Sequence, residues 1–298
     1  MKTISILVKR NTKLFFKDKA MFFTSLATPM ILLVLYATFL GNVYRDSFCM
    51  NLPEGIIIDE RVIDGLVGGQ LISSILAVSC VTVAFCSNLL MVQDKARGNI
   101  KDFTISPVAG SKLAIAYYIS TLISTLIVCI SAMVLCLVYL AIVGWYMSFL
   151  DILLLLIDIV LLVIFGTAMS SIINFFLTSE GQMSAVGSIV SSVYGFICGA
   201  YMPISSFGEG LQNVIAFLPG TYGTSLVRNH SMRGVLAEME RVGIPGDVVE
   251  SIKDSIDCNL YFFDNRVSIP TMYLALVVSA LLLVCVYVIM NRFKKVKK

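Results

Sequence analysis

Chemically reactive side chains are few in this chain, and the most unusual of them is a carboxylate. Asp158 stands in the middle of the apolar run 156–160. A charged aspartate at the centre of a membrane helix costs about 2.5 to 3.5 kcal/mol, so it needs a hydrogen-bonding partner or water. Two predictions stay open: Asp158 is a hydrogen-bonded structural residue, or it binds a cation or relays protons.

Residues for catalysis or nucleotide binding are missing from the sequence. No Gly-x-x-x-x-Gly-Lys-Ser/Thr occurs, so the chain has no phosphate-binding loop of its own. The single histidine, His230, falls in a predicted outer loop, and no Cys/His spacing fits a metal site. We therefore expect no catalytic residue, metal or bound cofactor in this chain, and any ATP with its Mg would be held by another polypeptide.

The cysteines fall into two groups. Six of the eight lie inside apolar runs, where cysteine behaves as a small hydrophobic residue. Cys49 and Cys258 instead fall one in each of two predicted outer loops, where a disulfide can form. Two predictions stay open: the two cysteines form a disulfide, or both remain free thiols.

The composition places these residues in a membrane. Hydrophobic residues make up 58% of the 298 residues and charged residues 14%, whereas soluble domains have about half and a quarter. This balance excludes an ordinary soluble protein, and a net charge of +3 excludes a nucleic-acid binder. Six runs are long and apolar enough for membrane helices, which predicts an all-α membrane protein. The expected spans are 20–40, 69–92, 113–143, 149–177, 183–203 and 268–290.

The basic residues predict how the chain is oriented. Fifteen of the 22 Lys and Arg residues fall on the side that holds both termini, and seven fall on the other. The excess of basic residues marks the cytoplasmic side, so both termini are expected in the cytoplasm and the six spans, within 20–298, in the plasma membrane. The first 19 residues are amphipathic, with Leu7 and Phe15 on one face and Lys9, Lys13 and Lys17 on another. They predict a cytoplasmic interfacial helix or, alternatively, a simple basic anchor.

The cytoplasmic segment 93–108, between the second and third spans, is expected to meet a partner. It mixes both charges and then presents an aromatic residue and a proline in a short apolar patch. An exposed patch of this kind is typical of a docking site, although burial under the chain's own interfacial helix is the alternative. The predicted coupling residues are Asp94, Arg97, Gly98, Asp102, Phe103, Ser106 and Pro107.

Two spans carry polar or small residues that predict close packing or a polar route. The fifth span has a stripe of small residues at every fourth position, flanked by an aromatic ring, and the second span is rich in hydroxyl groups. They either line a substrate pathway or subunit interface, or pack tightly within one subunit. The candidates are Ser79, Thr82 and Asn88 in the second span and Gly187, Ser191, Tyr194, Gly195 and Gly199 in the fifth.

The long outer segment 204–267 is expected to fold as a small cap. Residues 207–218 have one apolar helical face that ends at Pro219-Gly220, and this helix is expected to re-enter the outer leaflet. Asp247 followed by Glu250 predicts a capping box at the start of a second short helix.

Order and placement of two local motifs give a family resemblance. The segments 94–98 and 103–108 are similar to the loop that leads into the third span of type-2 ATP-binding-cassette exporter permeases, with aspartates in place of the usual glutamates. The segments 201–206, 218–222 and 226–228 are similar to that family's Pro-x-Ser, Asn-Pro-x-Thr-Tyr and Leu-Arg stretch, with Leu218 where Asn is common. The whole chain also resembles the membrane half of subfamily G transporters.

This resemblance implies a dimer of permease chains, identical or different, that carries two cytoplasmic ATPase subunits. The interfacial helix and the 93–108 segment would contact the ATPase, and the second and fifth spans of both copies would surround the substrate. The expected function is export of an amphiphilic drug, lipid or peptide. A stand-alone secondary transporter or channel, and a membrane sensor or immunity protein, are the alternatives.

Overall fold

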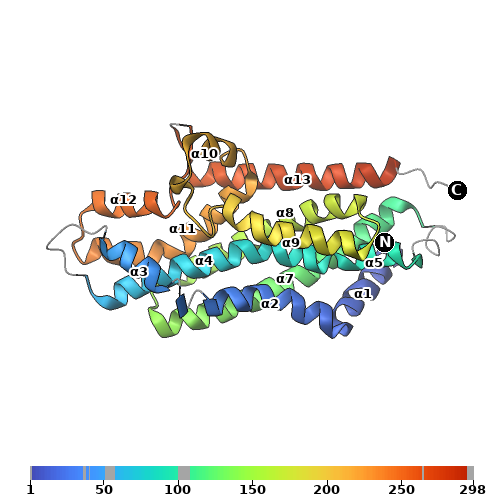
Figure 1. Cartoon of the computed structure of the whole chain (residues 1–298), viewed down its shortest axis with the longest axis horizontal. Helices are drawn as coiled ribbons and strands as arrows, with labels where there is room; N and C mark the ends of the chain where they lie inside the picture. Colours follow the sequence, from blue (N-terminus) through green and yellow to red (C-terminus); the bar gives the residue numbers. More distant parts are fainter. Residues whose placement is uncertain are drawn as a thin grey trace.

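The fold is a bundle of long helices that run along one axis (Figure 1). The computed structural model describes residues 2–35, 38–39, 41–50, 58–99, 108–263 and 265–293. Within these ranges, the strands are the two-residue β1 (Tyr261–Phe262) and β2 (Asn265–Arg266), which pair antiparallel. The helices are α1 Lys2–Lys17, α2 Lys19–Leu35, α3 Gly41–Met50, α4 Glu60–Ser87, α5 Leu89–Ala96, α7 Gly110–Val143, α8 Phe149–Phe176, α9 Glu180–Ile197, η2 Ile204–Ser206, α10 Glu209–Ile215, α11 Pro219–Arg241, α12 Gly246–Ser255 and α13 Ile269–Phe293.

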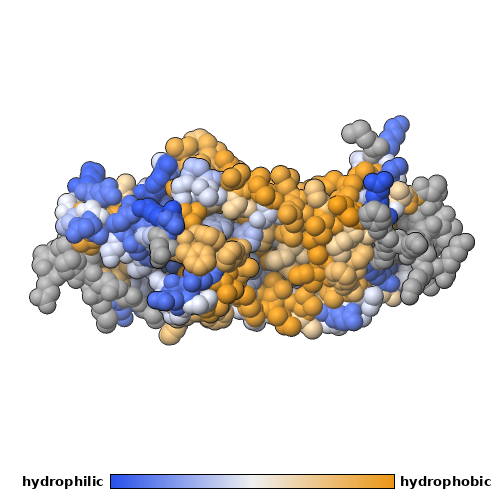
Figure 2. Space-filling view, turned by 90° about the horizontal axis from the view of Figure 1, so that it is seen from above, coloured by the Kyte–Doolittle hydropathy of each residue, from blue (hydrophilic) through white to orange (hydrophobic). Residues whose placement is uncertain are grey.

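The chain is a multi-pass membrane protein, and the prediction of an all-α fold is confirmed. Four helical segments are long and apolar enough to cross a membrane, namely α4 with α5, α7, α8 and α13. The pair α1 and α2, bent by 72°, makes a fifth if it is counted as one span. Figure 2 shows a hydrophobic belt over the middle of the molecule, with hydrophilic residues toward both ends. The fifth predicted span, 183–203, corresponds to α9, an 18-residue helix that is not among these five candidates, so a count of six spans stays a prediction.

Helix α4 forms the centre of the bundle. It contacts α2, α7, α8 and α11, and its Leu71, Ile72 and Ile75 are fully buried. Helix α8 crosses α4 closely at Gly166, where a Cβ atom would lie 3.0 Å from the carbonyl oxygen of Cys80. Glycine has no side chain and allows this close approach, so Gly166 lets α8 pack directly against α4.

Local residues explain where several helices begin. Ser148 and Asp151 form a capping box at the start of α8, and Ser179 and Gln182 form one at the start of α9. In α1, Leu7 and Phe15 are buried while Lys9 and the other lysines of that helix are exposed, so the helix is amphipathic; its place at a membrane interface stays a prediction. Figure 1 shows that α1 begins and α13 ends at the same end of the bundle, opposite α12.

Two predictions for the outer segment are wrong in detail. Pro219 begins α11 rather than ending the preceding helix, because proline lacks an N–H and suits the first helical turn. Helix α12 follows Pro245, and no side-chain capping bond involves Asp247; Glu250 instead pairs with Lys253 and Arg266. The apolar face of this helix is as expected, with Val249 and Ile252 buried.

Candidate functional site

A network of charges at one end of the bundle surrounds Asp94, a predicted coupling residue. We call it the α5 junction. The Asp94 side chain accepts hydrogen bonds from Arg10 Nη1 of α1 (2.9 Å), from Tyr117 Oη of α7 (2.6 Å) and from Asn99 Nδ2 (2.9 Å). Asp94 is only 3% exposed, so this buried carboxylate needs all of these donors. It therefore joins α1, α5 and α7 at one point.

The next residues of α5 extend the junction to two further helices. Lys95 Nζ donates to the carbonyl oxygens of Asn174, Phe175 and Leu177, at 2.6, 2.9 and 3.2 Å. These carbonyls end α8, where unpaired oxygens and the helix dipole favour a cation. Arg97 pairs with Glu180 at the start of α9, at 3.4 Å. The short helix α5 is thus tied to four other helices.

A cavity of about 450 Å³ opens between α5 and the elbow of α1 and α2. Its lining is charged at several positions: Arg10, Lys17, Asp18, Asp94 and Arg97. Gly98 follows directly, with a φ of +80° and no atom within 4 Å of where its Cβ would lie. A glycine with positive φ directly after a helix is a common way to end that helix, so Gly98 ends α5. The coupling residues Asp102, Phe103, Ser106 and Pro107 lie outside the described residues.

Asp158 has two partners inside the bundle. His230 Nδ1 of α11 lies 2.5 Å from Asp158 Oδ2, and Tyr273 Oη of α13 donates to Oδ1 at 2.6 Å. Asp158 is fully buried. The predicted location of His230 in an outer loop is therefore wrong. Residues 219–241 form a helix that packs against α4, α8 and α13, and local composition gave no indication of this. Among the described residues, no group of three or more His, Cys, Asp or Glu side chains could hold a metal ion.

Arg228 of α11 is the centre of a second buried network, which the sequence analysis missed. Its side chain is 0% exposed and donates to the carbonyl oxygens of Ile256 (2.7 Å) and Gly199 (2.8 Å). It also reaches Asp257 Oδ2 and Ser74 Oγ, both at 3.3 Å. These contacts join α4, the end of α9 and the outer loop after α12. The sequence signal for this residue is the Leu-Arg stretch at 226–228, which contributes to the family resemblance but does not indicate burial.

Asp257 has a shifted pKa for a clear physical reason. Burial raises the pKa of this carboxyl to about 6, although the charge of Arg228 and the backbone N–H of Ile204 oppose the rise. The Arg228 and Asp257 pair is thus stabilised by its hydrogen bonds against an unfavourable loss of hydration.

The polar residues predicted in the second span lie inside the chain. Ser79, Thr82 and Asn88 are each at most 1% exposed. Asn88 Nδ2 donates to Ser170 Oγ and Ser171 Oγ of α8, at 3.1 Å each. In this arrangement they pack within one subunit, as the alternative prediction expects.

The small-residue stripe of α9 has two different halves. A Cβ on Gly195 would lie 2.2 Å from the Tyr201 ring, so the chain's own Tyr201 covers this half. Gly199 has a φ of +74° and lies against Ile204, and Tyr194 lies against Gly220. By contrast, no atom lies within 4 Å of where a Cβ on Gly187 would be, and the neighbouring Ile189 is 61% exposed. Ser191, between the halves, is partly buried. The half of α9 around Gly187 is therefore open for contact.

Of the two cysteines predicted to pair, Cys258 is buried with a free thiol. The side chain of Cys49 lies outside the described residues, so the bridge stays a prediction.

Comparison with known proteins gives one result. Residues 2–230 match the family model described as the ABC-2 type transporter. This match includes α1 to α10, the α5 junction and the first half of α11. No curated protein matches the chain.

Proposed function

The chain belongs to the ABC-2 type transporter family, and we propose that it is the permease subunit of an exporter whose ATP is hydrolysed by a separate subunit. The family makes it a membrane component of a transporter. Export, the ATPase partner, a dimeric assembly and an amphiphilic substrate are our proposals.

The α5 junction is the observation that carries this proposal. An ATPase that moves the loop after Gly98 would pull on α5 directly. Because Asp94, Lys95 and Arg97 tie α5 to α1, α7, α8 and α9, that movement would reach four helices through hydrogen bonds and ion pairs. The buried Asp94 and the three hydrogen bonds of Lys95 have defined geometry, whereas the exposed Arg97–Glu180 pair is a weaker link. The charged cavity beside α5 is the surface at which we propose that the ATPase docks.

The open half of α9 supports the proposal of a second permease chain. Around Gly187 the helix exposes Ser184, Ser188 and the large apolar Ile189. Small residues allow two membrane helices to approach closely, and exposed hydroxyl groups suit a polar contact between them. A seam between two copies of α9 would offer an amphiphile both apolar and hydroxyl-bearing surfaces. The geometry leaves the identity of the second chain, and of the substrate, open.

The alternative of an ion-coupled secondary transporter would require Asp158 to bind a cation or proton during transport. Its Oδ1 accepts a hydrogen bond from Tyr273 Oη, and its Oδ2 lies within hydrogen-bond distance of His230 Nδ1. This supports a structural role that links α8, α11 and α13.

Reconstitution tests the proposed function. The chain is purified with and without a candidate ATP-binding-cassette ATPase and placed in proteoliposomes. Efflux of a cationic dye, a fluorescent lipid and a labelled peptide is then followed with ATP. We expect efflux only when both proteins and ATP are present, and none with an ATPase that lacks its catalytic glutamate. Efflux that continues without the ATPase would refute the proposal.

A further inference from the structure

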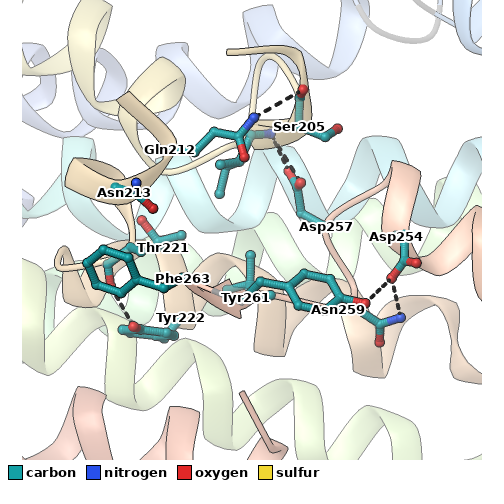
Figure 3. A pocket seen from close by; sticks show the side chains of 13 residues that line it. Ser205, Gln212, Asn213, Thr221, Tyr222, Asp254, Asp257, Asn259, Tyr261 and Phe263 are labelled. Atoms are coloured by element: carbon teal, nitrogen blue, oxygen red, sulfur yellow. Dashed lines mark hydrogen bonds between the residues drawn. The ribbon is translucent and has the colours of Figure 1, made fainter. Parts of the chain in front are cut away.

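A pocket of about 240 Å³ lies on the outer segment, away from the α5 junction (Figure 3). Residues of η2, α10, the start of α11, the end of α12 and the hairpin around β1 form its wall. The volume corresponds to about eight water molecules at roughly 30 Å³ each, which is enough for a small polar head group. Figure 3 shows Asp254 and Asn259 on one side, Phe263 and Tyr222 on the other, and the Tyr261 ring between them.

Most hydrogen-bond donors in this pocket are already used by the chain. Gln212 Nε2 donates to the Phe207 carbonyl oxygen at 2.6 Å, and Tyr222 Oη donates to that of Ala216 at 2.5 Å. Tyr261 Oη donates to Asp254 Oδ1 at 3.1 Å. The other donors with partners are Thr221 Oγ1 and Asn259 Nδ2.

Acceptor atoms, in contrast, are left without donors. Among the described residues, nothing donates to Asp254 Oδ2 or to Gln212 Oε1. The Ser205 hydroxyl and the Asn213 amide, which can donate or accept, complete the polar lining. A positively charged ligand would be attracted to these oxygens, whereas an anion would find few free N–H or O–H groups.

The charge of the pocket also favours a cationic ligand. Its described lining contains two carboxylates, Asp254 and Asp257, and no Lys or Arg. Arg228 already neutralises Asp257 at 3.3 Å. The remaining negative charge belongs to Asp254, at the partly exposed side of the pocket.

Aromatic rings provide the rest of the surface. Tyr222, Tyr261 and Phe263 line the pocket, and the faces of such rings attract organic cations. Just outside, the Phe217 ring lies 5.0 Å from Phe262 and 6.2 Å from Phe263, and it is 63% exposed. The exposed Val214 of α10 continues this apolar surface. The pocket therefore combines a carboxylate, aromatic faces and an apolar rim.

We propose that this pocket binds the ammonium group of a cationic amphiphile, with Asp254 and Tyr261 contacting the ammonium and the Phe217 surface contacting the apolar tail. The ammonium group could belong to a free amphiphile or to the head group of a choline lipid in the outer leaflet. This site does not depend on the ATPase, so it is independent of the proposed transport function.

Binding measurements test the proposal on the full chain in nanodiscs of phosphatidylglycerol. Octyltrimethylammonium is the probe, and calorimetry reports its Kd. Its neutral analogue, in which carbon replaces the nitrogen, measures the contribution of the charge. The variants are Asp254→Asn and Tyr261→Leu, and the matched control is Asp247→Asn, an exposed acid of α12 that does not line the pocket. Thermal melting confirms that each variant is folded.

We expect saturable binding of the cation and at least about tenfold weaker binding of the neutral analogue. Asp254→Asn and Tyr261→Leu should each raise the Kd by roughly tenfold, whereas Asp247→Asn should leave it unchanged. A higher apparent Kd in phosphatidylcholine nanodiscs would identify the lipid head group as a competing ligand, and an unchanged Kd would identify the free amphiphile. Equal affinity for the charged and neutral probes, or equal effects of Asp254→Asn and Asp247→Asn, would overturn the proposal.

Discussion

Replacement of Arg228 by methionine should open the outer segment of this permease. Methionine keeps an apolar side chain of comparable length but removes the cation that faces Asp257. It also removes the donors to the carbonyl oxygens of Ile256 and Gly199, at 2.7 and 2.8 Å. Loss of one member of a buried ion pair costs about 3 to 5 kcal/mol, because the other charge stays buried without compensation. The cost should fall on the contact that joins the outer loop to α4 and α9.

Cys258 provides a local measurement of this opening. Its thiol is 2% exposed and follows Asp257 directly in the chain. In a background with Cys49→Ser, Cys86→Ser and Cys285→Ser, a membrane-impermeant maleimide would label Cys258 only when the outer segment opens. Because about 1.4 kcal/mol corresponds to a tenfold change in an equilibrium, Arg228→Met should speed labelling by about 10² to 10³ fold.

Two controls make this prediction refutable. Arg241→Met removes an arginine of the same helix that is 77% exposed and pairs with Glu238, so labelling should change by no more than a few fold. Adding Asp257→Asn to Arg228→Met removes the uncompensated charge and should restore most of the protection. Labelling that rises less than tenfold in a folded Arg228→Met protein, or no recovery in the double variant, would refute the reasoning.

Four further predictions concern separate parts of the molecule. Asp94→Asn should lower transport per ATP by about 5- to 150-fold while ATP hydrolysis continues, measured in proteoliposomes with the ATPase, because it weakens the α5 junction. The stability of the outer segment should fall by roughly 3 kcal/mol between about pH 4 and pH 6, since Asp257 has a pKa of about 6 when folded and 3.8 when unfolded. Gly195→Ala should lower the melting temperature, because its Cβ would lie 2.2 Å from Tyr201. Asp158→Asn should preserve both folding and transport if Asp158 is structural.

Each of these predictions has its own check. Asp94→Glu should retain more coupling than Asp94→Asn, and equal coupling in all three proteins would count against the junction. The sign of the pH effect follows from the raised pKa: the folded state holds the proton more tightly, so stability is greater below pH 4 and Asp257→Asn should flatten the profile. Tyr201→Ala should rescue Gly195→Ala if the ring causes the clash. Selective loss of a cationic substrate in Asp158→Asn would favour a binding role instead.

The sequence by itself determined the membrane class and most helix positions. The predicted span 149–177 corresponds to α8, Phe149–Phe176, and the predicted interfacial helix corresponds to α1. These succeed because apolar length and helical periodicity are local properties, set by the thickness of a bilayer and by 3.6 residues per turn. Asp94 was singled out because it lies in the mixed-charge segment 93–108 and in the motif 94–98 that carries the family resemblance.

Only the tertiary structure decided which polar groups meet. His230 lies 72 residues from Asp158 in sequence, and Arg228 lies 154 residues from Ser74, yet each pair is within 3.3 Å. Each pair joins two different helices, α8 with α11 and α4 with α11, so no local pattern could have predicted either contact. Gly195 is a similar case. It was expected to allow close packing against another helix, but the chain turns back after α9 and the Tyr201 ring covers Gly195. Whether a charged residue is buried depends on how all the helices pack together. For this reason the sequence placed α11 in an outer cap, whereas in the structure it packs against α4, α8 and α13.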